Sequence, residues 1–259
     1  MKLSSLCGMA ALLGLLVSSP AGLAQLPSLN LGGGGAASGA DLATLARLFG
    51  SHTGFTAKSD IRVYDKDHKE TVSTLMNFAY LDNKARCEID MTHMKHKDLP
   101  AGIADQLQQF GMDQVVSIVR PDKKSLHVIY PKLQSYVTLP LAPDNLEAVA
   151  KAKTTKERLG TETLDGQPCV KHKVTLTTVN GEKQELTVWN ASNLKDFPVQ
   201  ILTKQDEGTV ITRYRQVQLA RPEAKLFDPP ATFKEYPDMQ SFMQGVLAKI
   251  MGDALSETK

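Results

Sequence analysis

The residues from Met91 to His96, with the sequence Met-Thr-His-Met-Lys-His, form the densest group of metal-ligating side chains in the chain. Thioether sulfur and imidazole nitrogen together can hold copper, and imidazole also suits zinc. Lys95 and Lys97 lie among these side chains, and their charges repel a cation. We therefore predict no metal site and no cofactor. A metal site remains an alternative, and it would use Met91, His93, Met94 and His96.

Motifs of the common enzyme classes do not occur in the sequence. The chain contains no Gly-x-Ser-x-Gly, no His-Glu-x-x-His, no phosphate-binding loop and no dinucleotide fingerprint. Glu88 and Asp90 alternate with apolar residues, which places them on the wet face of a predicted strand, where a carboxylate only solvates the surface. We therefore expect a protein that is not an enzyme and has no catalytic residues.

The first 24 residues have the pattern of a secretory signal peptide. Lys2 precedes an apolar run that ends near Val17, and Gly22 and Ala24 supply the small residues that a signal peptidase requires. The run is too short to cross a bilayer. We expect export to the periplasm or beyond, a soluble mature protein, and no transmembrane segment in it.

Two cysteines follow this leader, Cys87 and Cys169. An exported protein is in a compartment that favours disulfides. Strand alternation, however, places Cys87 among apolar residues and Cys169 with the lysines of its strand. A disulfide between them and two separate thiols both remain open.

The composition limits the class of partner and the number of domains. The chain has 259 residues, of which 42% are hydrophobic, and its 30 basic residues are nearly balanced by 28 acidic ones. It therefore lacks the excess of positive charge that binding to phosphate backbones needs, and we expect no nucleic-acid partner. The glycine-rich composition of residues 25–40 predicts a flexible tether. We expect residues 41–259 to form a single β-rich domain.

Alternating apolar and polar residues dominate that domain. Residues 72–80 and 86–91 predict an antiparallel hairpin. Nine further segments have strand patterns, separated for the most part by turn residues: 54–64, 113–120, 124–130, 134–139, 156–164, 169–179, 184–190, 197–205 and 208–219. Eleven strands with short turns predict a mainly β fold, built as one large curved antiparallel sheet or an unclosed β-barrel.

Helical spacing predicts four helices on this sheet. They lie near residues 41–49, 100–110 and 143–152, and at 237–252, where the apolar stripe is broadest. A curved sheet that is too wide to fill with its own side chains leaves a cavity, and helices can cover it. The nine methionines of the chain suit such a cavity, because thioethers adapt to irregular apolar shapes. Strand alternation gives these candidate lining residues: Met76, Phe78, Tyr80, Ile89, Met91, Val128 and Tyr130.

Several short motifs resemble those of an exported bacterial family of unknown function that is placed near the LolA and LolB outer-membrane lipoprotein carriers. They include Met91-Thr92-His93-Met94-Lys95, Arg120-Pro121-Asp122-Lys123, Asp165-Gly166-Gln167-Pro168-Cys169 and Leu226-Phe227-Asp228-Pro229-Pro230. The resemblance covers about residues 52–236. It implies an unclosed antiparallel barrel in which helices act as a lid over a cavity for acyl chains. No functional residue is carried over from it.

These observations lead to a prediction and an alternative. The predicted function is that of a LolA-like periplasmic protein that binds a lipid, a lipoprotein acyl chain or another apolar ligand in the concave face of the sheet. The alternative is a structural or sensory module of the cell envelope, in which the barrel is filled and the sheet binds a protein partner.

Overall fold

The computed structural model describes residues 39–97, 102–141, 152–177, 181, 183–205 and 208–256. The predicted signal peptide, most of the predicted tether and all but the last residue of the predicted helix at 143–152 lie outside these ranges. The tether was predicted to reach residue 40, but helix α3 already begins at Gly39. Among the helices of the described residues, none has the length and hydropathy that crossing a membrane requires.

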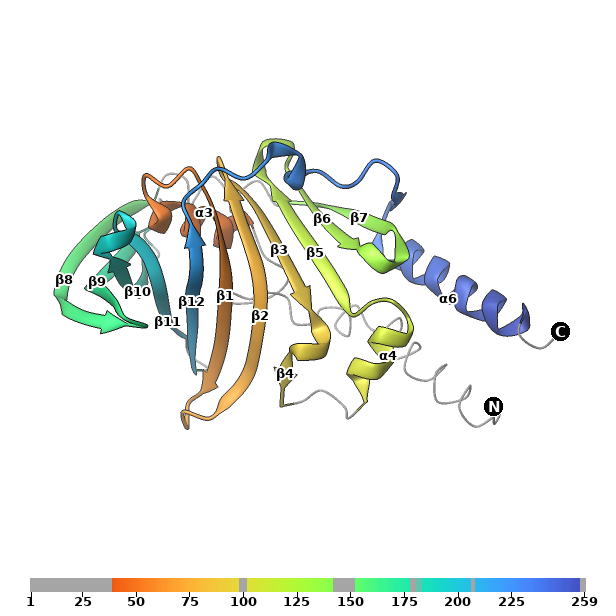
Figure 1. Cartoon of the computed structure of the whole chain (residues 1–259), viewed down its shortest axis with the longest axis horizontal. Helices are drawn as coiled ribbons and strands as arrows, with labels where there is room; N and C mark the ends of the chain where they lie inside the picture. The colour runs from red at the N-terminus through yellow and green to blue at the C-terminus, as the bar shows by residue number, and fades with distance from the viewer. Residues whose placement is uncertain are drawn as a thin grey trace.

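Thirteen strands form one open, curved sheet (Figure 1). They are β1 (Gly54–Asp65), β2 (Glu70–Leu81), β3 (Lys84–Asp90), β4 (Lys95–His96), β5 (Gln114–Arg120), β6 (Ser125–Tyr130), β7 (Ser135–Pro140), β8 (Lys153–Leu164), β9 (Gln167–Thr177), β10 (Lys183–Ala191), β11 (Phe197–Gln205), β12 (Gly208–Gln218) and β13 (Lys234–Tyr236). Their order is β13-β7-β6-β5-β3-β2-β1-β12-β11-β10-β9-β8, and β4 pairs with β2 outside this path. The predicted fold class is confirmed.

All eleven predicted strands are present, with ends that differ by a few residues. The two strands that the sequence did not predict are β4 and β13, which are two and three residues long. β13 pairs in parallel with β7, whereas the other pairs among the described strands are antiparallel. Such short strands are set by the neighbour against which they lie, and an alternation of apolar and polar residues cannot show in two or three residues.

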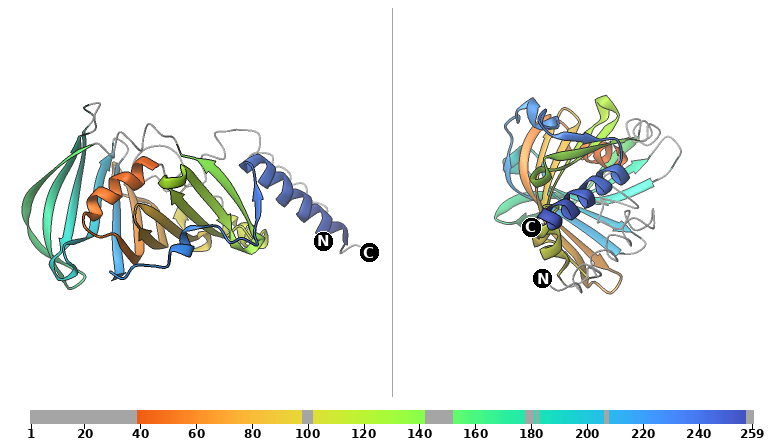
Figure 2. Two further views of the ribbon diagram at one scale, coloured as in Figure 1. Left: turned by 90° about the horizontal axis from the view of Figure 1, so that it is seen from above. Right: turned by 90° about the vertical axis from the view of Figure 1, so that its right-hand side faces the viewer.

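The helices of the described residues are α3 (Gly39–Phe49), α4 (Ile103–Gln109) and α6 (Met239–Ser256), and five single 3-10 turns accompany them. These turns are η1 (Met91–His93), η2 (Pro121–Lys123), η3 (Pro131–Leu133), η4 (Ser192–Leu194) and η5 (Ala224–Phe227). The predictions of helices near 41–49, 100–110 and 237–252 are therefore confirmed. From above, α3 lies inside the curve of the sheet and α6 projects from its end (Figure 2).

α3 packs on the concave face of the sheet through Phe49. The Phe49 ring lies 4.7 Å from that of Phe55, 5.1 Å from Tyr80 and 5.9 Å from Phe197, measured between centroids. Aromatic pairs at these distances contribute beyond the burial of their area. Strand alternation places Phe55 and Tyr80 opposite each other on the concave face, where they build the largest apolar cluster of the fold.

The opposite, convex face is crossed by residues 219–233, which we call the strap and which connect β12 to β13. The strap lies on the other side of the sheet from α3 (Figures 1 and 2). Its Phe227 is completely buried in a second cluster on this face, formed by Ala79, Leu81, Val116, Ile118 and Ile129. The chain thus passes from the middle of the sheet to the β7 edge and then enters α6.

α6 covers the far end of the concave face. The ring of Phe242 stacks on that of Tyr130 at 4.6 Å, and Met243 and Val246 join the same buried cluster. Gly245 permits this approach, because a Cβ atom there would lie 2.5 Å from the hydroxyl oxygen of Tyr236. Two separate helices therefore pack on one curved apolar face, α3 over its middle strands and α6 at its β7 end (Figure 2).

Candidate functional site

Three of the seven predicted lining residues are buried beneath α3. Met76, Phe78 and Tyr80 share the concave face, and each is at most 5% exposed. Phe49 lies against this group, with its ring 6.0 Å from that of Phe78. The half of the concave face formed by β1, β2, β11 and β12 is therefore filled by the protein's own helix.

Tyr130 is buried at the other end, beneath α6, where burial raises the pKa of its phenol to about 12. Met91 takes a different position, because β3 ends at Asp90 and Met91 begins the 3-10 turn η1. The apolar clusters of the described residues do not include Met91. The structure therefore places Tyr130 in a different buried cluster from Met76, Phe78 and Tyr80, and Met91 outside the clusters of the described residues.

The remaining two, Ile89 and Val128, lie between the helices. They are partly buried, as are Val115 and Leu139, and we call these four residues the apolar strip. They come from β3, β5, β6 and β7, which are neighbours in the sheet, and Ile89 pairs directly with Val115. Val128 and Leu139 pack against both the cluster under α3 and the cluster under α6. The strip therefore joins two buried cores into one continuous apolar surface.

Cys87 and Cys169 are free and buried. Of the two alternatives that the sequence left open, the structure therefore has two separate thiols and not a disulfide. Burial raises the pKa of the Cys87 thiol to about 12. The pKa of Cys169 is also raised by burial, and its Sγ donates to the carbonyl oxygen of Gln167 at 3.4 Å. Since a thiolate is the reactive form, neither side chain has the character of a nucleophile.

One of the candidate metal ligands, His93, lies beside a carboxylate. His93 Nδ1 lies 3.3 Å from a carboxylate oxygen of Asp90, whose other oxygen accepts hydrogen bonds from Thr92. Within the described ranges, no group of three or more His, Cys, Asp or Glu side chains is arranged to hold a metal ion. Asp90 instead caps η1 and ends the strand.

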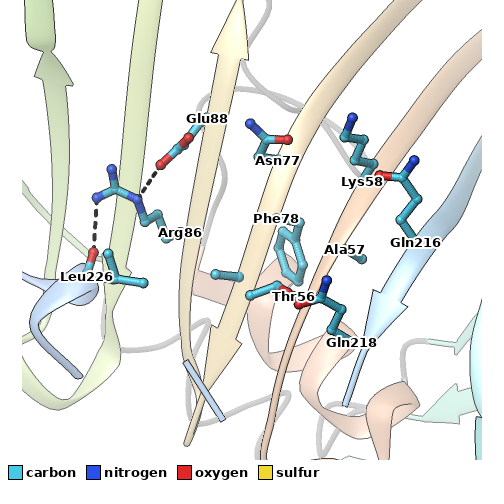
Figure 3. Close-up of a pocket in the computed structure, with 11 residues that line it drawn as sticks. Thr56, Ala57, Lys58, Asn77, Phe78, Arg86, Glu88, Gln216, Gln218 and Leu226 are labelled. Carbon is cyan, nitrogen blue, oxygen red and sulfur yellow. Dashed lines mark hydrogen bonds and ion pairs between the residues drawn. The ribbon is translucent and has the colours of Figure 1, made fainter. Parts of the chain in front are cut away.

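A groove on the convex face was not predicted from the sequence. It has a volume of about 330 Å³ and runs across β12, β1, β2 and β3 up to Leu226 of the strap (Figure 3). Seven of its eleven lining residues are polar or charged, among them Thr56, Lys58, Asn77 and Gln218. Strand alternation predicts that these residues face away from the core, but their assembly depends on the register between strands. We call this feature the polar groove.

The strap is held by charged groups beside Phe227. Arg120 donates to the carbonyl oxygen of Phe227 at 2.8 Å and to the carboxylate of Asp228 at 2.5 Å. It also forms two hydrogen bonds with Asp122, and this pairing lowers the pKa of Asp122 to about 2. Lys123 binds Asp228 at 2.8 Å, and the pKa of Asp228 is lowered by that bond and by Arg120. The motif residues 120–123 and 226–230 therefore fasten the strap.

His127 lies beside this clamp on the convex face and is buried. Its Nε2 is 3.2 Å from Ser125 Oγ, its Nδ1 is 3.0 Å from Thr138 Oγ1, and Thr138 donates to Glu235 of β13 at 2.7 Å. Burial lowers the pKa of His127, and the charge of Lys123 lowers it further. The neutral imidazole is therefore the form that the fold stabilises.

We expect the free energy of unfolding to fall as the pH drops below about 6.5, the ordinary pKa of histidine. The unfolded chain then binds a proton that the folded chain excludes. His172 adds to the effect, because burial lowers its pKa also. The urea midpoint, measured between pH 7.5 and 5.5, should depend less on pH in His127→Gln than in the unmodified protein. It should depend least on pH in the double variant that also carries His172→Gln. An unchanged slope in the double variant would exclude these two groups as the cause.

The chain was compared with family models, curated proteins and solved structures, and only solved structures match it. No family model and no curated protein matches the sequence. The lipoprotein LppX of Mycobacterium tuberculosis is 13% identical, with 68% of this chain and 94% of LppX covered and a TM-score of 0.38. A LolA superfamily protein from Nitrosomonas europaea is 12% identical, with coverages of 74% and 98% and a TM-score of 0.35. The MucA/MucB complex of Pseudomonas aeruginosa is 11% identical, with 75% of this chain and 62% of that chain covered and a TM-score of 0.36.

A LolA superfamily protein is thus among the structures to which the chain is similar, as the resemblance in the sequence implied. At these identities the similarity concerns the fold alone. What the chain binds has to be inferred from its own residues.

Proposed function

We propose that the chain is a LolA-like periplasmic protein that binds a lipid, a lipoprotein acyl chain or another apolar ligand on the apolar strip of its concave face. The observation that carries this proposal is the strip itself. Ile89, Val115, Val128 and Leu139 remain partly exposed inside the curve of the sheet, between the two helices that pack on this face.

The dimensions of the strip suit a chain-like ligand. Its four residues lie on four successive strands, which span about 14 Å at a spacing of about 4.8 Å. The register offsets Val128 and Leu139 by two residues each along the strands, so the strip runs diagonally and is about 20 Å long. Each buried methylene contributes about 0.8 kcal/mol before the cost of association is subtracted. A segment of ten fully buried methylenes therefore supplies about 8 kcal/mol before that cost, and this burial is the driving force that the strip offers.

A folded variant with a less apolar strip tests this proposal. Val128→Thr keeps the shape of the side chain and exchanges a methyl group for a hydroxyl, and Ile89→Thr keeps the β-branching but replaces an ethyl group with a hydroxyl. Burying two unpaired hydroxyls should weaken binding about tenfold or more. The readout is the fluorescence of 11-(dansylamino)undecanoic acid on titration, with thermal melting as the check of folding.

The matched control is Leu75→Thr. Leu75 is 58% exposed on the convex face, so the same kind of substitution removes apolar surface outside the strip. This control should bind the probe as the unmodified protein does. If the double variant folds and binds the probe equally well, the strip is not the binding surface.

The filled-sheet alternative is favoured by one observation, which is the insertion of Phe49 into the concave face. Five aromatic rings lie within 6.0 Å of its centroid, so this half of the face has no room for a ligand. Under that alternative the probe does not bind at all, and a protein partner is recognised by the outer surface. Probe titration of the unmodified protein therefore separates the two functions.

A further inference from the structure

The polar groove lies on the face opposite to the apolar strip and is independent of the function proposed above. Strand register builds it as two rows of side chains that cross the sheet. In one row Thr56 pairs with Gln218 on one side and with Ala79 on the other. In the second row Lys58 pairs with Asn77, and Asn77 pairs with Glu88. Each row extends about 14 Å from β12 to β3.

The charges of the groove are unevenly paired. Arg86 Nε donates to Glu88 at 2.7 Å, and Arg86 Nη1 donates to the carbonyl oxygen of Leu226 in the strap at 3.0 Å (Figure 3). The charges of Arg86 and Glu88 therefore neutralise each other, and the two side chains close one end of the groove. Lys58 is exposed, and among the residues that the structure describes no acidic group forms an ion pair with its ammonium. The groove thus has one uncompensated positive charge near its centre.

Gln216 enters the groove at a cost in backbone energy. The pairing of β1 with β12 shifts between Thr56 and Lys58, and Gln216 occupies the bulge with a φ of 51°. A left-handed conformation is unfavourable for a residue with a side chain, and bulges commonly redirect a side chain next to a binding site. Here the bulge places the Gln216 carboxamide beside Lys58 (Figure 3). Strained residues of this kind persist where the surroundings enforce them, often at functional sites.

We propose that the polar groove binds a short extended peptide segment that carries an acidic side chain. Lys58 receives the carboxylate. The carboxamides of Asn77, Gln216 and Gln218 each offer a donor and an acceptor, which matches the N–H and C=O groups of a peptide backbone. At about 3.4 Å per residue, a groove of about 14 Å holds about four extended residues. Leu226, which is 37% exposed at the end of the groove, provides one apolar contact.

The test is a titration of the isotope-labelled protein with the capped tetrapeptide Ac-Ala-Glu-Ala-Leu-NH2, followed by NMR. We expect saturable shifts of the side-chain amide signals of Asn77, Gln216 and Gln218. The neutral peptide Ac-Ala-Gln-Ala-Leu-NH2, and likewise the variant Lys58→Gln with the acidic peptide, should each weaken binding about three- to fivefold, the value of one exposed ion pair. Lys58→Arg should retain binding.

Two further variants separate a site from general surface charge and from strain. Lys156→Gln removes an exposed lysine on β8, outside the groove, and should leave the dissociation constant unchanged. Gln216→Gly relieves the left-handed backbone, so we expect an equal or higher melting temperature together with weaker peptide binding. A variant that is stabilised but binds unchanged would show that Gln216 is not part of the site.

Three results would overturn the proposal. They are the absence of saturable shifts with the acidic peptide, equal binding by Lys58→Gln and the unmodified protein, and shifts that appear only with a trimer of galacturonic acid. The last result would assign the groove to an acidic saccharide. Dansylundecanoate binding, measured on the same samples, should not change in any groove variant, so failure of this proposal is distinguishable from failure of the proposed function.

Discussion

Replacing Phe227 with alanine should release the strap and lower the free energy of unfolding by about 3–5 kcal/mol, the range observed when a buried phenylalanine is truncated. Its ring is 0% exposed, and it fills the convex cluster around Ile118 and Ile129. The substitution leaves a cavity between the strap and the sheet. Because β13 and α6 follow the strap directly, limited proteolysis between β12 and β13 should become faster, and urea denaturation should show the loss of stability.

The matched control is Leu226→Ala. Leu226 is adjacent in the chain but 37% exposed, so its truncation should change the free energy of unfolding by less than about 1 kcal/mol. The polar contacts of Arg120 and Lys123 with Asp228 are the same in both variants. If Phe227→Ala is no less stable than Leu226→Ala, the charged clamp alone holds the strap, and the apolar anchor is unnecessary.

Replacing Phe49 with alanine should have an effect of similar size on the other face, about 3–5 kcal/mol in the free energy of unfolding. Phe49 is 1% exposed and is the main contact of α3 with the sheet, through Phe55, Tyr80 and Phe197. Its removal leaves a cavity that the surrounding rings cannot close without leaving their packed positions. Urea denaturation measures the loss.

Leu48→Ala serves as the comparison on the same helix. Leu48 is only partly buried, and alanine is at least as favourable as leucine in a helix, so the loss should be about 1 kcal/mol. Because Phe49 does not belong to the apolar strip, Phe49→Ala should still bind the dansylated acid. A folded Phe49→Ala protein that no longer binds it would show that α3, and not the strip, forms the binding surface.

The fold could be predicted in large part because its strands are long and regularly alternating. β1, β2 and β12 have eleven or twelve residues each, so their two faces are already distinguishable in the sequence. β13 could not be found in this way, because its three residues pair with β7 through a contact between distant parts of the chain. Phe227 was part of a recognised motif, but its role as the strap's anchor depends on the same kind of contact.

The candidate site was predictable only in part. Alternation correctly grouped Met76, Phe78 and Tyr80 on one face, but the position of Phe49 over them follows from the docking of a helix, which no periodicity encodes. The polar groove could not be predicted, because Gln216 faces it only through a bulge in the pairing of β1 with β12. Residue types and spacing therefore identified the faces, and long-range packing decided which parts of them remain accessible.

The central claim is that the apolar strip binds an apolar ligand, and the native mass of the protein tests it most directly. The full chain is produced with its leader, purified from a bacterial periplasm under mild conditions and then incubated with an excess of phospholipid. We predict a native mass that exceeds the mass of the denatured chain by that of one lipid. A native mass equal to that of the bare chain, even after this incubation, would contradict the account and favour the filled sheet.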